Sequence, residues 1–411
     1  MKSKFILKIM SPAVASCPLD SHLPVFLDRL RQQGYCATSL KPKIVVLKRF
    51  NRWIGSRELA LADLDEHTVF SFFKELPRPG HVRRGDLAVL MALVDYLREI
   101  GAAPPDPSVS AINSFQRIED RFSIYLRDQR GLSQASVLNY SRIARLFLSQ
   151  ATKEPAGDQS EPSCRQIRDF ICKAADSASP RYVQLITCAL RSFLRFLYID
   201  GKTSRDLSLC VPTVAEWKLS ALPKFIEPTQ VEAILAHCDL GTEIGKRDLA
   251  ILLLLARLGL RACEVRNMAL DDIHWESGQL TVRGKGGIQN RMPIPNDVGE
   301  ALADYLLDGR PRCETRKVFV RAKAPRQGFK SSAAVCDTVR RALSRAGLNP
   351  LRKGAHLLRH SLAVKLLRDG ATINEIAEVL RHGSHTATEI YTKVDLSMLG
   401  TVAQPWPGGA P

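Results

Sequence analysis

The stretch His356-Leu357-Leu358-Arg359-His360-Ser361 opens the segment around which the rest of this chain is organised. A helical segment follows it, and then come Arg381-His382-Gly383-Ser384 and Thr388-Glu389-Ile390-Tyr391. His356 and Arg359 share one face of a helix, because residues three apart are neighbours on its surface. A guanidinium is planar and always charged, so it suits bidentate binding of a phosphate. The segment therefore carries groups that can hold a phosphodiester and a tyrosine that can attack it.

Tyr391 is the candidate nucleophile of this segment. The pKa of a free tyrosine is about 10, so its attack needs cations around the phosphate and a route for its proton. Both can come from a set of cationic or titratable side chains: Arg261, Arg359, His356 and His382. Lys285 lies in a glycine-rich turn and can protonate the departing 5′ oxygen as a general acid. The plain alternative for Lys285 is a solvated hairpin tip.

The composition favours a polyanionic partner. The formal net charge is +17 and the sequence pI is about 9.6, and nucleic acid is the commonest partner of such proteins. Charge alone leaves a generic basic protein open. The sequence has neither the carboxylate cluster of a two-metal nuclease nor a Walker loop, so we expect no metal and no cofactor. Its longest apolar run, Leu249 to Ala256, is far shorter than the roughly 20 residues of a membrane span.

The sequence contains 10 cysteines. None has C-x-x-C spacing, and most lie within apolar helical patterns, where a thiol behaves as a small hydrophobic group. We therefore expect reduced cysteines in a cytoplasmic protein, with neither a disulfide nor a zinc site.

Two helical blocks precede the segment's own domain, over about Ser21–Ala103 and Ala111–Leu209. They resemble each other: the run that ends at Gly34 is similar to the run that ends at Gly131, and Phe50 and Phe147 lie equally far beyond these glycines. This pattern predicts a duplicated small helical domain. Chance similarity of two amphipathic bundles is the alternative.

The third domain begins with a nearly all-apolar helix over about Lys246 to Leu258, which we expect to be buried. Arg261 follows its end, and Glu264 can orient Arg261 if this turn is helical. A surface ion pair is the alternative. From Ile273 to Pro295 the pattern changes to short strands with glycine turns. The predicted fold is mainly α with a small antiparallel β-sheet in the catalytic domain (α+β).

Six residues in this order resemble the catalytic set of the tyrosine recombinase (phage integrase) family: Arg261, Lys285, His356, Arg359, His382 and Tyr391. The contexts Gly-Leu-Arg-x-x-Glu, Gly-Lys-Gly and Ile-Tyr-Thr make the similarity specific. The resemblance implies five parts: an N-terminal helical domain over 1–106 (a possible duplicate of the next), a core-binding helical DNA-binding domain over 111–209, a linker over 210–225, a catalytic domain over 226–395, and a C-terminal tail over 396–411.

The resemblance also implies a role for each residue. Tyr391 would attack the scissile phosphate and form a 3′-phosphotyrosine link, and Arg261 and Arg359 would clamp the phosphate oxygens. Lys285 would be the general acid, His356 would assist proton transfer, and His382 would donate a hydrogen bond to the phosphate. Since the covalent link retains the bond energy, neither ATP nor a metal is required.

The implied protein is a site-specific DNA recombinase that integrates or excises a mobile element. Its partner would be double-stranded DNA, on which four copies assemble, with or without partner recombinases. It would act in the cytoplasm at the nucleoid and away from the membrane. A type IB topoisomerase and a catalytically silent DNA-binding protein of the same fold are the alternatives. One departure is visible, because Arg381 stands where the family often has glycine. An arginine there can touch backbone phosphate.

Overall fold

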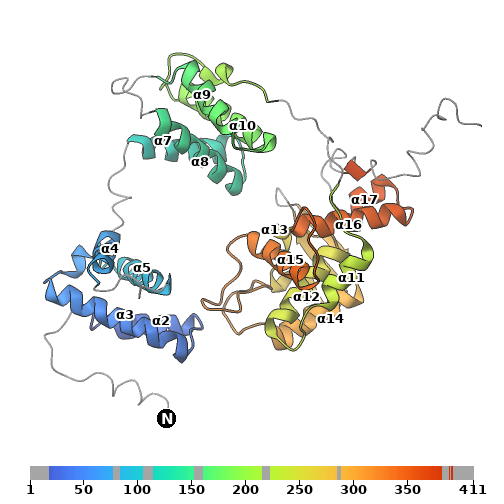
Figure 1. Cartoon of the computed structure of the whole chain (residues 1–411), viewed down its shortest axis with the longest axis horizontal. Coiled ribbons are helices and arrows are strands. Elements are labelled where there is room, and N and C mark those ends of the chain that lie inside the picture. Colours follow the sequence, from blue (N-terminus) through green and yellow to red (C-terminus); the bar gives the residue numbers. More distant parts are fainter. Residues whose placement is uncertain are drawn as a thin grey trace, which may run out of the picture. The chain divides into compact units, whose positions relative to one another are not determined.

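The computed structural model describes residues 18–76, 84–104, 114–151, 161–214, 223–284, 288–381, 388, 390 and 391. The chain divides into two compact units, Leu97–Lys218 and Met1–Tyr96 with Leu219–Pro411. Figure 1 shows the chain coloured along its sequence. The finer division into domains over 1–106, 111–209 and 226–395 stays a prediction.

The N-terminal block is helical, as its periodicity predicts. Its elements are α2 (Leu23–Gln32), α3 (Ala37–Ser56), η1 (Leu61–Asp63), α4 (Glu66–Lys74) and α5 (Arg84–Glu99). Asp65 caps α4, because its carboxylate accepts a hydrogen bond from the Thr68 amide at 2.7 Å. Phe26, Phe50 and Phe72 are buried between the helices.

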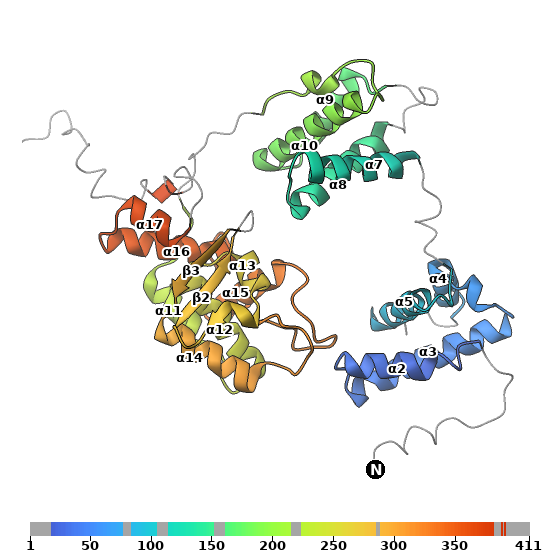
Figure 2. The same cartoon turned by 180° about the vertical axis from the view of Figure 1, so that it is seen from behind.

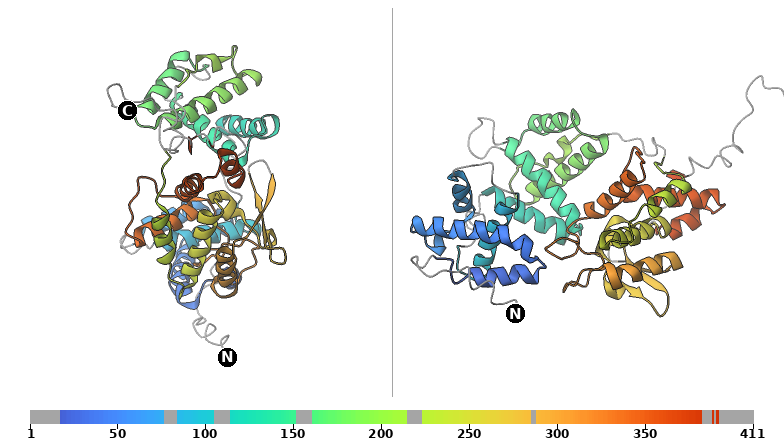
Figure 3. Two further views of the ribbon diagram at one scale, coloured as in Figure 1. Left: turned by 90° about the vertical axis from the view of Figure 1, so that its right-hand side faces the viewer. Right: turned by 60° about the horizontal axis from the view of Figure 1, so that its bottom comes forward.

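The second block has the same order of helices. Its elements are α7 (Ser114–Ile124), the π-helical turn η3 (Tyr125–Gln129), α8 (Gln134–Ala151), α9 (Cys164–Ala175), α10 (Pro180–Ile199) and η4 (Leu207–Cys210). They pack against one another around Phe122, Phe147 and Phe193, and they are the cyan-to-green helices of Figure 3. By length and composition alone α10 is apolar enough to cross a membrane, but half of it is buried in this bundle.

The glycines of the two blocks adopt the same unusual backbone. Gly34 and Gly131 end the first helical segment of each block with φ of +88° and +59°. Gly101 and Gly201 end the last helix of each block with φ of +71° and +69°. Glycine enters this left-handed region freely, whereas other residues rarely do. Many helices end in this way, so the duplication stays a prediction.

The expectation of no disulfide was wrong. Cys164, at the start of α9, is bonded to Cys210, at the end of η4, with their Cα atoms 5.4 Å apart. Both elements pack on the core of the second block, which brings two thiols together that are 46 residues apart in the sequence. A bond that tertiary packing creates leaves no trace in local spacing.

Among the described residues, no group of His, Cys, Asp and Glu side chains could hold a metal.

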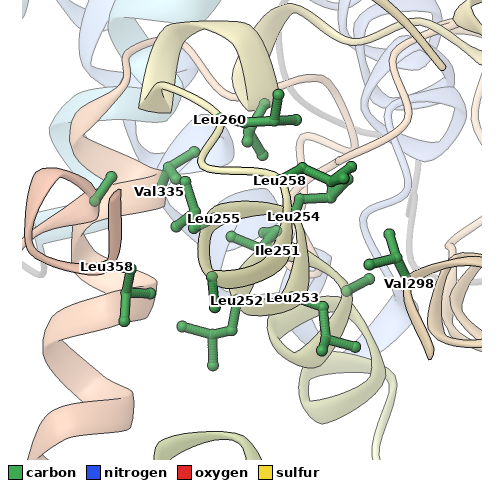
Figure 4. Close-up of a cluster of buried hydrophobic side chains, with 14 of the residues drawn as sticks. Ile251, Leu252, Leu253, Leu254, Leu255, Leu258, Leu260, Val298, Val335 and Leu358 are labelled. Atoms are coloured by element: carbon green, nitrogen blue, oxygen red, sulfur yellow. The ribbon is translucent and has the colours of Figure 1, made fainter. Parts of the chain in front are cut away.

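The elements after the second block pack around the apolar helix predicted from the sequence, α12 (Glu243–Arg257), and they belong to the same unit as residues 1–96. This helix begins slightly earlier than expected, because the Thr242 hydroxyl caps it by accepting from the Gly245 amide at 3.0 Å. Ile251, Leu252, Leu254 and Leu255 are fully buried, and Figure 4 shows them facing the surrounding elements. The helices packed around α12 are α11 (Pro228–Ala236), α13 (Ala262–Asn267), α14 (Asn296–Asp304), α15 (Ala333–Arg345) and α16 (Ala355–Arg368).

The predicted small sheet is present and antiparallel, in the order β1 (Ile273–His274), β2 (Gln279–Arg283), β3 (Gln289–Pro293). Leu280 pairs with Met292 in the register of β2 with β3, and both strands are labelled in Figure 2. The short segments η5 (Leu270–Asp272) and η7 (Tyr305–Gly309) and the last helix, α17 (Ile373–Val379), complete the unit. The α+β fold class is therefore confirmed.

The burial of α12 gives a stability prediction. Leu254→Ala should lower the free energy of unfolding of this unit by about 2–5 kcal/mol, because it removes buried methyl groups and leaves a cavity. Denaturant unfolding measures the change. The matched control, Leu351→Ala at a side chain that is 87% exposed, should change the free energy by under about 0.5 kcal/mol. Equal effects of the two substitutions would contradict the assigned core.

Candidate active site

Arg261 is positioned by the end of α12. The chain turns at Gly259, whose φ is +57° and where an added Cβ would lie 2.7 Å from Leu380 Cδ2. Arg261 is then the N-cap of α13, and its guanidinium donates to Glu264 Oε1 at 2.8 Å. The other carboxylate oxygen of Glu264 accepts from the Arg261 amide, also at 2.8 Å. The Glu264 side chain is 1% exposed, so the surface ion pair considered from the sequence is excluded.

Arg359 projects from α16 into the same region and is 3% exposed. Its guanidinium donates to the backbone carbonyls of Gly259 and Leu380. Burial, followed by the nearby charges of Arg261 and Arg381, lowers the pKa of Arg359 to about 10. It therefore stays a cation at neutral pH. Among the described residues, no carboxylate lies within ion-pair distance of it.

Tyr391 lies against α16. Its ring is 1% exposed and packs with Ala363, Val364 and Leu380. Its hydroxyl oxygen is 2.7 Å from Nδ1 of His360. Burial raises the pKa of Tyr391 to about 12, while the charge of Arg359 acts in the opposite direction.

His360 contacts the candidate nucleophile and was not among the residues predicted from the sequence. Burial, followed by the nearby His356 and Arg359, lowers its pKa to about 4, so its imidazole is neutral at physiological pH. A neutral imidazole can accept the tyrosine proton at one ring nitrogen. Two features of the sequence could have indicated His360: it directly follows Arg359, and it lies one helical turn after His356. In the structure the two histidine rings are 6.1 Å apart.

Of the three other residues predicted for the site, the structure describes His356 alone. His356 is exposed on the first turn of α16. Lys285 and His382 lie outside the described residues, so their predicted roles stay predictions.

Arg381, the departure noted in the sequence, lies beside this group. Its guanidinium donates to Glu264 Oε2 at 3.3 Å, and its carbonyl accepts from Arg261 at 3.2 Å. Burial lowers its pKa from the ordinary arginine value. The site therefore gathers three guanidiniums, those of Arg261, Arg359 and Arg381, around one carboxylate, Glu264. This excess of buried positive charge suits a bound anion.

Comparisons with known proteins show which family this chain belongs to. Residues 224–398 match the model described as "Phage integrase family", and residues 120–201 match "Phage integrase, N-terminal SAM-like domain". The chain is 38% identical over 96% of its length to y4rA of Sinorhizobium fredii, whose name describes an integrase/recombinase and which is covered to 96%. It is 30% identical to tyrosine recombinase XerD of Listeria monocytogenes serovar 1/2a, over 67% of this chain and 93% of that protein.

Solved structures agree on the fold. The XerH site-specific recombinase bound to palindromic difH substrate aligns with a TM-score of 0.56 and 16% identity, over 82% of this chain and 93% of that one. From these similarities and the matched family model, the chain belongs to the phage integrase family and is a site-specific DNA recombinase of the tyrosine type.

Proposed function

We propose that this recombinase cuts and rejoins DNA through a 3′-phosphotyrosine intermediate in which Tyr391 is the nucleophile. The supporting observation is the contact of the buried Tyr391 hydroxyl with Nδ1 of His360 at 2.7 Å, beside the arginine group. A tyrosine with a raised pKa attacks only when cations surround the phosphate and a base takes its proton. In this proposal the neutral His360 takes the proton, and Arg261 and Arg359 supply the cations.

Each residue has a distinct part in the proposed reaction. Arg261 and Arg359 hold the non-bridging oxygens, where negative charge grows as the pentacoordinate phosphate forms. Lys285 gives a proton to the departing 5′ oxygen, and His382 donates a hydrogen bond to the phosphate. His356 assists proton transfer from the exposed start of α16. Rejoining reverses these steps, with a 5′ hydroxyl attacking the phosphotyrosine.

The proposed partner is double-stranded DNA, which both helical blocks would contact. In α3 five side chains are basic and none is acidic: Lys41, Lys43, Lys48, Arg49 and Arg52. Such a helix is suited to the sequence-independent phosphate contacts that position a protein on a duplex. We further propose that four copies exchange strands, with or without partner recombinases, to integrate or excise a mobile element in the cytoplasm at the nucleoid.

A nicked suicide substrate tests the proposed chemistry. It carries the native element end, so that the cleaved strand cannot be rejoined, and the reaction contains EDTA and no ATP. A covalent protein–DNA band should appear on a denaturing gel with the wild type and vanish with Tyr391→Phe, while DNA binding persists. A band that survives Tyr391→Phe would assign the nucleophile elsewhere. DNA binding without a wild-type band, even after host extract is added, would favour the catalytically silent protein.

The contact between His360 and Tyr391 generates a second prediction. His360→Leu should slow single-turnover cleavage by about a hundredfold, because the ring nitrogen that contacts the tyrosine hydroxyl is then lost. His360→Asn keeps a polar atom near the position of Nδ1 and should retain more activity than His360→Leu. Equal rates for the wild type and His360→Leu would refute the proposed role.

The low pKa of His360 can be measured directly. In the DNA-free protein its imidazole should remain neutral from pH 8 down to about pH 5.5, since its pKa is lowered to about 4. Nuclear magnetic resonance of histidine-labelled protein reports the ring state, and the signal lost in His360→Asn identifies the residue. A titration midpoint near 6.5, the ordinary value, would show that the ring is not buried in this way.

A further inference from the structure

Arg381 occupies a backbone conformation that favours glycine. Its φ is +53°, in the left-handed region, which a residue with a Cβ enters rarely and with strain. Glycine would meet the same backbone requirement without strain. A strained arginine is retained only where the surrounding structure enforces it, and such residues are concentrated at functional sites.

The side chain of Arg381 is held in the site and is incompletely satisfied. It is 10% exposed. One terminal nitrogen donates to Glu264 Oε2 at 3.3 Å, and the other contacts the Val379 carbonyl at 3.0 Å and Met292 Sδ at 3.1 Å. Its Nε is buried and has no hydrogen-bond partner among the described residues. A buried unpaired donor is costly, so it indicates a partner that binds there.

The charges of the site point to the chemistry of that partner. Glu264 is shared by Arg261 and Arg381, and Arg359 bonds only backbone carbonyls among the described residues. Three guanidiniums thus surround a single carboxylate. A phosphodiester carries one negative charge, and a second develops in its pentacoordinate transition state, so the excess positive charge of the site matches the reacting group.

We propose that Arg381 is a third guanidinium of the phosphate site, which donates its Nε–H to a non-bridging oxygen of the scissile phosphodiester. This inference rests on the proposed strand-cleavage function and adds a phosphate contact to it. Arg381 stays protonated throughout and forms no covalent bond. Its bond to Glu264 holds the guanidinium at the carboxylate that also binds Arg261.

The competing explanation is that Arg381 only supports Glu264, which in turn holds Arg261. A methylphosphonate at the scissile position separates the two explanations, because a methyl group replaces one non-bridging oxygen and removes the negative charge. An arginine that stabilises this charge loses most of its effect on the neutral substrate. A residue that only positions its neighbours affects both substrates alike.

The experiment compares single-turnover cleavage by the full-length wild type and Arg381→Gly on phosphate and methylphosphonate suicide substrates. On the phosphate substrate the variant should be slower by about 10². On the methylphosphonate substrate the ratio of the two rates should shrink by about tenfold or more. The control, Arg316→Gln at an exposed arginine paired with Asp271, should match the wild type on both.

Glycine suits the φ of residue 381, so Arg381→Gly should unfold at the same temperature as the wild type or above it. If this variant does not fold, Arg381→Gln replaces it in the same comparison. An unchanged cleavage rate on the phosphate substrate, or equal slowing on both substrates, overturns the role of Arg381. A wild type that cleaves neither substrate overturns the proposed function itself, and this inference with it.

Discussion

Glu264 forms the ion pairs on which the geometry of the site depends. Its carboxylate is almost fully buried and is bonded by the amide and guanidinium of Arg261 and by the guanidinium of Arg381. A buried carboxylate is tolerated only when its charge is matched and its oxygens are bonded, and here both conditions are met by residues of the site. Removing it would leave the buried Arg381 and the partly buried Arg261 without their carboxylate partner.

The apolar helix α12 provides the rigid base for these ion pairs. Its leucines fill the core formed with the surrounding helices α11 and α13 to α16, so the turn that follows at Gly259 has a fixed place. The Gly259 carbonyl accepts from Arg359 of α16, and the Leu380 carbonyl after α17 accepts from the same guanidinium. Arg359 thus joins three segments that are distant in the sequence: the turn at Gly259, the helix α16 and the end of α17. Ser361 adds a further connection, since its hydroxyl accepts from the Ile226 amide at 2.9 Å.

Local sequence patterns predicted the elements and the contact that residues close in the sequence determine. The spacing of Arg261 and Glu264 predicted their contact, and the apolar run predicted α12. The change in the hydrophobic period after it predicted the three-stranded sheet. Contacts made by tertiary packing were missed. The approach of His360 to Tyr391 requires two residues 31 apart in the sequence to meet, and the bond of Cys164 to Cys210 requires α9 and η4 to share a core. The catalytic roles, including those of Lys285 and His382, are expectations from the resemblance and stay proposals.

The central claim is that Tyr391 becomes covalently linked to DNA, and mass spectrometry of the linked peptide tests it most directly. The covalent complex is trapped on a suicide substrate, digested with nuclease and trypsin, and fragmented to locate the nucleotide. We predict a nucleotide joined through its 3′ phosphate to the tyrosine of the peptide that contains Ile390-Tyr391-Thr392. A nucleotide on any other residue, or one joined through its 5′ phosphate, would contradict it.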